Sequence, residues 1–593
     1  IPGDPARSAP GAGDQVRRHG AHPALELRIG RIRDRQRRDD GVKVYEAVLD
    51  QLISGGVQYF AGMVGSTSAP YVGTLASRND ARYLAVRHEH VAAAMMDATA
   101  RLSGKPGCVM VHGGSGLLAA SLGIASAALD ATPMVVLSLT QERRAMENGW
   151  WQTTNVLAPL EEVAKWQLRI ERPDQAVSAV RRAIAESVSG RPGVAQLDIP
   201  IDVSLQDIDN PPTPLSLHSA PLLRPWPDPE RIARAAEILS AADRPVILVG
   251  GGAAYSGAGE ALLKLCEALV APVVNTPTSR AVLPESHPHV LGPSGIIGYE
   301  PMGEAIAQAD AILAIGSRLS DIQLSRRELL PPGAPIIQVD ISPGAIAKDL
   351  DVTLPVVADS RAFTESLLAA LPAPEDGVRA ERARWIASLD TGVREWRAQW
   401  LDASPQNGML QPQEIVGALE QLPGDTIFVH GAGDHGFFGF MVPIDAPGNH
   451  LMSTRLGAMG STLGSALGAK LQRPEQPVVA CVGDGDFMLQ LGDVETMVRE
   501  QLPVVVVIFN NFRLGSQRKR VEAYGPVVGV DHGNPDFAKL AELFGCRGYR
   551  VDQPGEFAAA LSDALASGAP CLIDAIIDPE ARPPRLAISR EAR

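Results

Sequence analysis

The chain has 593 residues, of which 45% are hydrophobic and 21% charged, and its formal net charge is −14. These values are typical of a globular protein with three or four domains, and the negative charge argues against a nucleic-acid partner. No stretch has the roughly 18 consecutive apolar residues of a membrane span, so we expect no membrane partner either. The five cysteines form no CxxC pair, which argues against a disulfide framework or a zinc site and favours a reducing cytoplasm.

The first forty residues differ from the rest. Arg-rich runs such as RIGRIRDRQRR alternate with Pro, Gly and Ala, and they lack the apolar centre of a secretory signal. We interpret residues 1–40 as a disordered extension.

From Val42 onward, strand and helix patterns alternate, which favours an α/β fold with mainly parallel sheets and helices on both faces. Pro-rich and charged stretches divide this part of the chain. We predict domains at 41–209, 231–371 and 409–580, a linker at 210–230, a linker and charged helix at 372–408, and a tail at 581–593.

Two turns stand out in the first domain. A strand ends at Val86 and a helix begins at Glu89, whose carboxylate would complement the helix dipole if it has no other role. A second strand ends at His112, and Gly114-Ser115-Gly116 follow in a turn that needs glycine for its backbone. His112 could reach a ligand or pack inside the domain.

The stretch from Val482 to Asn511 organises the third domain. It reads VGDGDFMLQLGDVETMVREQLPVVVVIFNN, with a helical pattern from about Leu491 to Arg499 and a strand from Pro503 to Phe509. A right-handed crossover between two parallel strands would place Asp484 and Asn511 side by side at the carboxyl ends of those strands.

The residue types at this corner suit a metal and a phosphate. Carboxylate and amide oxygens favour Mg²⁺ or Ca²⁺ over zinc, and Gly483 and Gly485 allow phosphate oxygens to approach the backbone. The alternative is a strand turn with an N-capping Asp484 followed by a polar loop.

The GDG and NN pairs at this spacing resemble the cofactor motif of thiamine diphosphate (ThDP) enzymes. From Val42 to Pro579 the chain is most similar to the acetolactate synthase branch, the acetohydroxyacid synthase large subunits and their decarboxylase relatives. The resemblance implies a pyrimidine-binding, a middle and a diphosphate-binding domain, in a homodimer or homotetramer with active sites at a subunit interface.

The resemblance also implies roles for the motif residues. Asp484, the Asn511 side chain and the backbone carbonyl of Arg513 would hold Mg²⁺. Glu89 would hydrogen-bond the aminopyrimidine and favour the imino tautomer that takes the C2 proton. Met459 would support the bent cofactor, although core packing is the alternative. The other implied cofactor contacts are Gly433, Asp434, His435, Gly457, Gly483, Gly485 and Asp486.

Trp151-Gln152 aligns with a Phe-Gln pair that lines the substrate pocket in acetohydroxyacid synthases. Gln152, which we assign to catalysis, could orient a carbonyl or carboxylate, and Trp151 could narrow the pocket beside Leu117 and Leu118. The implied pocket residues are Gly65, Ser66, His112, Gly114, Trp151 and Gln152.

Acetohydroxyacid synthases bind FAD in the middle domain, but here the motif positions are substituted. Ser279-Arg280-Ala281 replaces Gly-Lys-Gly, residues 294–298 replace a Met-His-Gly-Thr region, and Gly316-Ser317-Arg318 is kept but followed by Ser320-Asp321-Ile322-Gln323. We therefore expect that FAD is not bound.

The implied reaction is decarboxylation of a 2-oxo acid and ligation of the resulting enamine to a second carbonyl. The alternatives are a simple 2-oxo acid decarboxylase, a C–C lyase, or a non-catalytic ThDP-binding partner subunit. Retention of Glu89, Asp484 and Asn511 speaks against the last of these.

Overall fold

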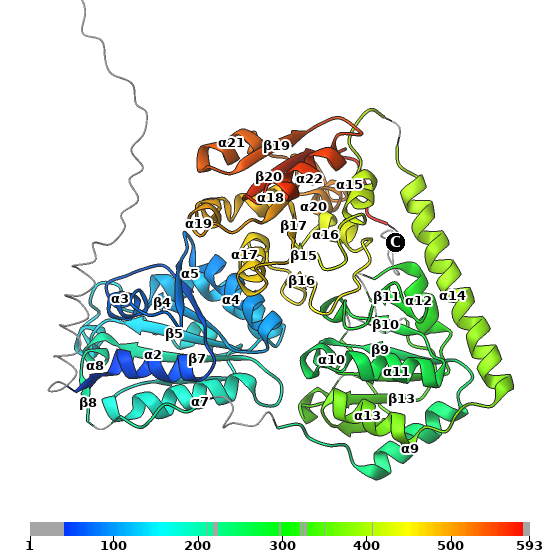
Figure 1. Ribbon diagram of the computed structural model, residues 1–593, viewed down its shortest axis with the longest axis horizontal. Coiled ribbons are helices and arrows are strands. Elements are labelled where there is room, and N and C mark those ends of the chain that lie inside the picture. The colour runs from blue at the N-terminus through cyan, green and yellow to red at the C-terminus, as the bar shows by residue number, and fades with distance from the viewer. Residues whose placement is uncertain are drawn as a thin grey trace, which may run out of the picture.

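The computed structural model describes residues 41–209, 211–216, 223–295, 298–320, 324, 329–348, 350–405 and 407–584. The predicted extension lies outside this range, as do parts of the predicted 210–230 linker and 581–593 tail and the motif positions 296–297 and 321–323. The described chain forms three α/β domains, each built on a six-stranded parallel sheet (Figure 1). The predicted fold class is confirmed, while the exact domain limits stay predictions.

The first domain has the strand order β3-β2-β4-β5-β7-β6. Its central strands are buried on both faces, as their continuous apolar runs indicate. A two-stranded antiparallel ribbon of β1 and β8 closes its base. The elements are β1 Val42–Lys43, α2 Val44–Ser54, β2 Tyr59–Gly62, α3 Ala69–Leu75, β3 Arg82–Ala85, α4 Glu89–Ser103, β4 Gly107–His112, α5 Ser115–Leu129, β5 Met134–Thr140, α6 Arg143–Glu147, β6 Trp166–Arg169, α7 Ala176–Val188, β7 Val194–Pro200, α8 Ile201–Ser204 and β8 Asp207–Ile208.

The middle domain has the order β11-β10-β9-β12-β13-β14, and the long helix α14 runs from it along the outside of the molecule towards the third domain (Figure 1). Arg382 anchors α14, because its buried guanidinium donates to the carbonyls of Leu269 and Leu239. The elements are α9 Pro229–Ala241, β9 Pro245–Val249, α10 Gly251–Ser256, α11 Gly259–Leu269, β10 Val273–Asn275, β11 Val290–Pro293, α12 Glu300–Ala307, β12 Ala311–Ile315, β13 Ile336–Asp340, β14 Leu354–Val357, α13 Ser360–Ala370 and α14 Asp376–Asp402.

The third domain has the order β16-β15-β17-β18-β20-β19. The helix predicted from Leu491 begins only at Val494, because a 3₁₀ turn occupies Leu491–Asp493. The elements are α15 Pro412–Leu419, β15 Ile427–His430, α16 Asp434–Gly439, β16 His450–Met452, α17 Thr462–Gln472, β17 Val478–Gly483, α18 Asp484–Met488, α19 Val494–Arg499, β18 Val505–Asn510, α20 Gly515–Glu522, α21 Phe537–Phe544, β19 Arg547–Val551, α22 Phe557–Ala566 and β20 Cys571–Ile576. In the described part of the chain, no helix combines the length and apolar character needed to cross a bilayer.

The first and third domains meet where α4 packs on α17 (Figure 1). Two glycines on α17 allow this approach. A Cβ on Gly464 would lie 2.8 Å from the Val91 carbonyl oxygen, and a Cβ on Gly468 would lie 2.2 Å from the Met95 carbonyl oxygen. The helix backbones are therefore nearly in contact, and a side chain at either position would push the domains apart.

We predict that Gly468→Ala lowers the free energy of unfolding by about 1–3 kcal/mol, the usual cost of overpacking. Gly417→Ala in α15 is the matched control, because a Cβ there meets no atom within 4 Å and should gain up to about 1 kcal/mol in helix propensity. Urea unfolding of both variants measures the difference. Equal stability of Gly468→Ala and the unmodified protein would contradict the close helix contact.

Candidate active site

The carboxyl ends of β17 and β18 form the corner predicted from the sequence. The two strands pair in parallel, with Val482 opposite Ile508 and Gly483 opposite Phe509. Asp484 follows β17 as the first residue of α18, and Asn511 directly follows β18. Both residues therefore lie at the same edge of the sheet.

Asp484 is 2% exposed, and three neighbours surround its carboxylate. Asn534 Nδ2 donates to Oδ2 over 2.7 Å, the Gly485 N–H donates to Oδ1 over 2.8 Å, and His532 Nε2 lies 3.5 Å from Oδ2. Burial raises the pKa of Asp484, and the Asn534 hydrogen bond offsets part of that increase. A cation at this corner would stabilise the charged carboxylate.

Asn534 also donates to Asn510 Oδ1 over 2.8 Å, so one amide ties both strand ends together. The sequence reasoning missed Asn534 and His532. They belong to the segment before α21. The sequence HGNPD there, typical of a polar turn, is the signal that could have indicated them.

Asn511 lies close to Gly515, the first residue of α20, together with Asp434, the first residue of α16. A Cβ on Gly515 would lie 3.1 Å from Asn511 Nδ2 and 2.9 Å from Asp434 Oδ2, so both side chains lie over this glycine. Asn511 Oδ1 accepts from the Arg513 N–H over 3.2 Å. Burial raises the pKa of Asp434, while Lys519 and Arg520 of α20 lower it.

His435 fills a cradle of glycines. A Cβ on Gly433 would lie 2.8 Å from His435 Cε1, and a Cβ on Gly483 would lie 2.8 Å from its Nδ1. Burial lowers the pKa of His435 to about 4, so the ring is neutral at pH 7. Its buried Nε2 has no hydrogen-bond partner among the described residues. A Cβ on Gly431 would lie 2.6 Å from this Nε2. A neutral histidine with an unpaired nitrogen, surrounded by glycines and next to a carboxylate–amide corner, fits a bound diphosphate with a divalent cation.

The structure changes the expectation for Asp486. Its carboxylate is 2% exposed and accepts hydrogen bonds from the Gly460 N–H and from Thr462 Oγ1, the latter over 3.1 Å. Burial raises its pKa to about 6. The side chain therefore anchors the 460–462 turn, and only the backbone of Asp486 is left for the predicted diphosphate contact.

The segment before that turn is exposed at residues 455–457. Gly457 has φ +61°, and a Cβ there would meet nothing within 4 Å. Met459 is half-buried and lies outside the described core clusters. This position disfavours the core-packing alternative for Met459.

Glu89 is the first residue of α4, as predicted. Its Oε1 faces Gly116, where a Cβ would lie 3.2 Å away. The next residue, His90, is buried, and its Nε2 lies 3.2 Å from Ser461 Oγ of the third domain. The first turn of α4 therefore contacts the turn that Asp486 anchors.

The pocket residues predicted in the first domain separate into two groups. His112 lies 3.0 Å from Gln152 through Nε2 and Oε1, and Gly65 and Gly114 pack against these two residues. Ser66 and Trp151 are exposed, Trp151 to 73%.

Leu117 and Leu118 were expected beside the pocket. Leu117 is fully buried in a core cluster shared by the first and third domains, whereas Leu118 is 53% exposed, so only Leu118 presents its side chain at the surface.

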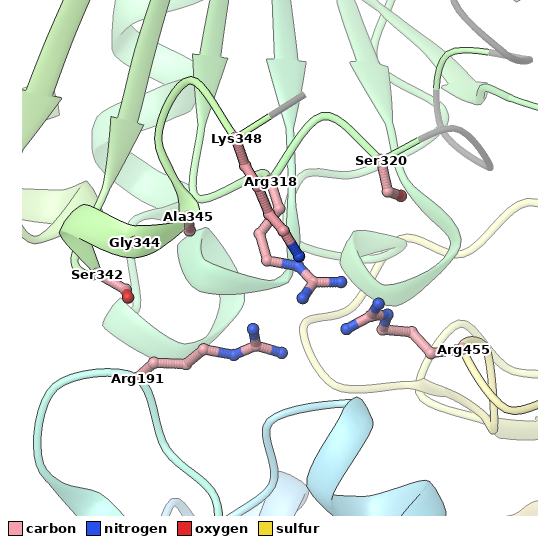
Figure 2. Close-up of a pocket in the computed structure, with 8 residues that line it drawn as sticks. All are labelled: Arg191, Arg318, Ser320, Ser342, Gly344, Ala345, Lys348 and Arg455. Atoms are coloured by element: carbon pink, nitrogen blue, oxygen red, sulfur yellow. The ribbon is translucent and has the colours of Figure 1, made fainter. Parts of the chain in front are cut away.

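A second cleft lies where the three domains meet (Figure 2). Arg191 enters it from the first domain, Arg318 and Lys348 from the middle domain, and Arg455 from the third. Burial and then the charges of Arg191 and Arg455 lower the pKa of Arg318 to about 10. The sequence reasoning noted Arg318 but not Arg191 or Arg455, because only the fold brings them together.

Comparison with known proteins gives three family matches. Residues 42–158 match the N-terminal TPP binding domain of thiamine pyrophosphate enzymes, residues 232–367 match the central domain, and residues 431–575 match the C-terminal TPP binding domain.

Three relatives are similar over nearly their whole length. A probable acetolactate synthase large subunit of Methanocaldococcus jannaschii is 31% identical, covering 91% of this chain and 92% of the relative. The isozyme 3 large subunit of Escherichia coli acetolactate synthase is 30% identical, and the Haemophilus influenzae large subunit is 29% identical; each match covers 88% of this chain and 92% of the relative.

We predict that Asn534→Ala weakens Mg²⁺-dependent ThDP binding by about 10–100-fold, the usual effect of losing a residue that orients a metal ligand. Calorimetric titration with ThDP and Mg²⁺ measures this change, with the exposed Asn79→Ala as control. Unchanged affinity in Asn534→Ala would show that this amide does not position the corner.

Proposed function

Because this chain belongs to the thiamine pyrophosphate enzyme family, we propose that it is an acetolactate synthase-like enzyme that decarboxylates a 2-oxo acid and ligates the product to a second carbonyl. The observation that carries the proposal is the corner of buried Asp484 and half-buried Asn511, next to His435, whose buried Nε2 is unpaired among the described residues. Similarity to acetolactate synthase large subunits over most of the chain supports the reaction type.

Asp484, the Asn511 amide and the Arg513 carbonyl would hold Mg²⁺ in this proposal. A carboxylate with two neutral oxygens leaves coordination positions for diphosphate oxygens and water. Gly433, Asp434 and His435 would lie along the diphosphate, with Gly483, Gly485 and the backbone of Asp486 on its other side. Lys519 and Arg520, which lower the pKa of Asp434, would limit repulsion between this carboxylate and the diphosphate.

ThDP supplies a thiazolium ring that accepts the electrons released when a 2-oxo acid loses CO₂. The Glu89 carboxyl would hold the proton exchanged with the aminopyrimidine. The Gly457 carbonyl would accept from its amino group, and Met459 would support the bent cofactor. Gln152 would orient the substrate, and Trp151 would limit its size.

We propose that two copies of the chain complete each site, in a homodimer or homotetramer. Large apolar side chains are exposed on both halves of the candidate site, which supports a covering partner. In the first domain these side chains are Met63, Val64, Leu118, Trp150 and Trp151, and in the third they are Leu456, Met488, Leu489 and Phe512.

The cytoplasm is the proposed location. All five cysteines are free thiols and buried, including Cys546 and Cys571, whose pKa values burial raises. Unpaired thiols suit a reducing compartment.

The direct test is an assay of purified protein with ThDP, Mg²⁺ and a panel of 2-oxo acids, following CO₂ and the products. Release of CO₂ with formation of an α-hydroxy ketone is expected, which is a 2-hydroxy-3-oxo acid when the second carbonyl belongs to another 2-oxo acid. Aldehyde alone would identify a simple decarboxylase, and no CO₂ from any 2-oxo acid would overturn the proposal.

We predict that Glu89→Gln binds ThDP but exchanges the C2 proton of the cofactor about 10²–10⁴-fold more slowly, because an amide cannot relay the proton. Quenched-flow exchange in D₂O gives the rate, and the exposed Glu162→Gln serves as control. Exchange at the unmodified rate would leave Glu89 as a residue that only begins a helix.

We also propose that the enzyme needs no FAD. Ser279 and Arg280 are buried and bonded within the chain: Ser279 Oγ donates to the Val249 carbonyl, and Arg280 pairs with Glu285 and donates to the Val442 carbonyl.

The purified protein should therefore be colourless and fully active without added flavin. Two measurements check this expectation: absorbance at about 350–500 nm, where a bound flavin absorbs, and activity after dialysis. A yellow protein that loses activity when its flavin is removed would contradict it.

A further inference from the structure

Three polar side chains form a hydrogen-bond chain beside Glu89. Thr67 and His112 are 2% and 8% exposed, and Thr67 Oγ1 lies 2.6 Å from His112 Nδ1. His112 Nε2 lies 3.0 Å from Gln152 Oε1. The three residues come from the turn after β2, the end of β4 and the segment after α6, so only the fold brings them together.

The proton positions in this chain follow from the distances. Thr67 Oγ1 lies 2.6 Å from the Leu139 carbonyl oxygen, and two oxygens this close require a proton between them. The carbonyl has none, so the Thr67 hydroxyl donates to Leu139. The same Oγ1 must then accept a proton from His112, and Nδ1 therefore carries one.

This constraint determines what Nε2 can do. In a neutral ring Nε2 is only an acceptor, so the Gln152 NH₂ group must face it and Gln152 Oε1 must face the pocket. In an imidazolium Nε2–H is a donor, so Gln152 Oε1 faces the ring, as in the structure, and the NH₂ group faces the pocket. The two states differ by a flip of the amide.

The backbone of Gln152 is held in place by its neighbours. Gln152 has φ +62°, an uncommon conformation for a residue other than glycine. A Cβ on Gly114 would lie 2.8 Å from the Gln152 carbonyl oxygen, and a Cβ on Gly65 would lie 2.8 Å from His112 Cβ. The ring and the Gln152 backbone are therefore confined.

We propose that His112 is a positioning residue whose protonation state selects the face that Gln152 presents to the substrate. An imidazolium gives a donor face, which suits the carboxylate or carbonyl oxygen of a 2-oxo acid, and a neutral ring gives an acceptor face. Binding of a 2-oxo acid anion is thus coupled to proton uptake at His112. The inference rests on the proposed function for the identity of the ligand.

The Glu89 carboxylate lies near this hydrogen-bond chain. A Cβ built on Gly116 would lie 3.2 Å from Glu89 Oε1 and 3.8 Å from His112 Cβ, so both side chains contact the same glycine. The other contacts described above for this hydrogen-bond chain, with Gly65, the Leu139 carbonyl and Gln152, are contacts with uncharged groups.

The test uses the full-length protein loaded with ThDP and Mg²⁺, and oxamate as an inert 2-oxo acid analogue. Calorimetric titrations at pH 7 in phosphate and in Tris, whose ionisation enthalpies differ, give the protons taken up per site. The unmodified protein should take up a fraction of a proton on binding. His112→Gln should take up none and bind oxamate within about tenfold as tightly, the effect of one hydrogen bond. His287→Gln, in the middle domain, is the histidine control.

Two substitutions at Thr67 distinguish an effect of the hydrogen-bond chain from an effect of altered packing. Thr67→Val removes the hydroxyl, so a neutral ring can carry its proton on Nε2 and donate to Gln152 without proton uptake. This variant should bind oxamate with little coupled uptake, whereas Thr67→Ser, which keeps the hydroxyl, should match the unmodified protein. Equal uptake in His112→Gln, Thr67→Val and the unmodified protein would overturn the proposal.

A measurement without ligand distinguishes this inference from the proposed function. In ¹⁵N NMR of histidine-labelled protein, with His112 identified by its loss in His112→Gln, the ring should keep a proton on Nδ1 at all pH values, and Thr67→Val should release it. A neutral ring protonated on Nε2 would contradict the proton positions proposed for the hydrogen-bond chain. An intact Nδ1–H chain without oxamate binding would instead reject a 2-oxo acid ligand.

Discussion

The parallel pairing of β17 with β18 is the constraint on which the candidate site depends. Two parallel strands need a crossover connection, which α18 and α19 form here. The carboxyl ends of β17 and β18 therefore lie at the same edge of the sheet. Asp484 and Asn511 both reach that edge, and Asn534 joins Asp484 to Asn510, the residue before Asn511. Buried carboxylate and amide oxygens are costly without a partner, and the neutral His435 beside them retains an unpaired nitrogen. The geometry of the corner therefore supports the proposed binding of a cation and an anion together.

The contact between domains extends this corner to the first domain. Asp486 fixes the Gly460–Thr462 turn, His90 contacts Ser461 of that turn, and Glu89 precedes His90 on α4. The glycines of α17 keep α4 at backbone distance. A shift of α4 would thus displace both the turn and Glu89, so domain packing and site geometry are coupled.

Local signals in the sequence predicted much of this arrangement. The apolar strands and their GDG and NN ends located the corner, and a strand followed by a helix start located Glu89, because each depends on a short stretch of chain. Side-chain partners could not be predicted in the same way. Asp486 turned towards Thr462 and Leu117 towards the core, and Asn534, Arg191 and Arg455 approach from segments that only the fold places nearby.

The most direct test of the account is a crystal structure of the protein with ThDP and Mn²⁺ in place of Mg²⁺. Anomalous scattering locates Mn²⁺ independently of the protein coordinates. The account predicts a peak bounded by the Asp484 carboxylate, the Asn511 amide oxygen and the Arg513 carbonyl, in contact with the diphosphate. ThDP bound with no peak at that corner, or with the metal held by other residues, would contradict it.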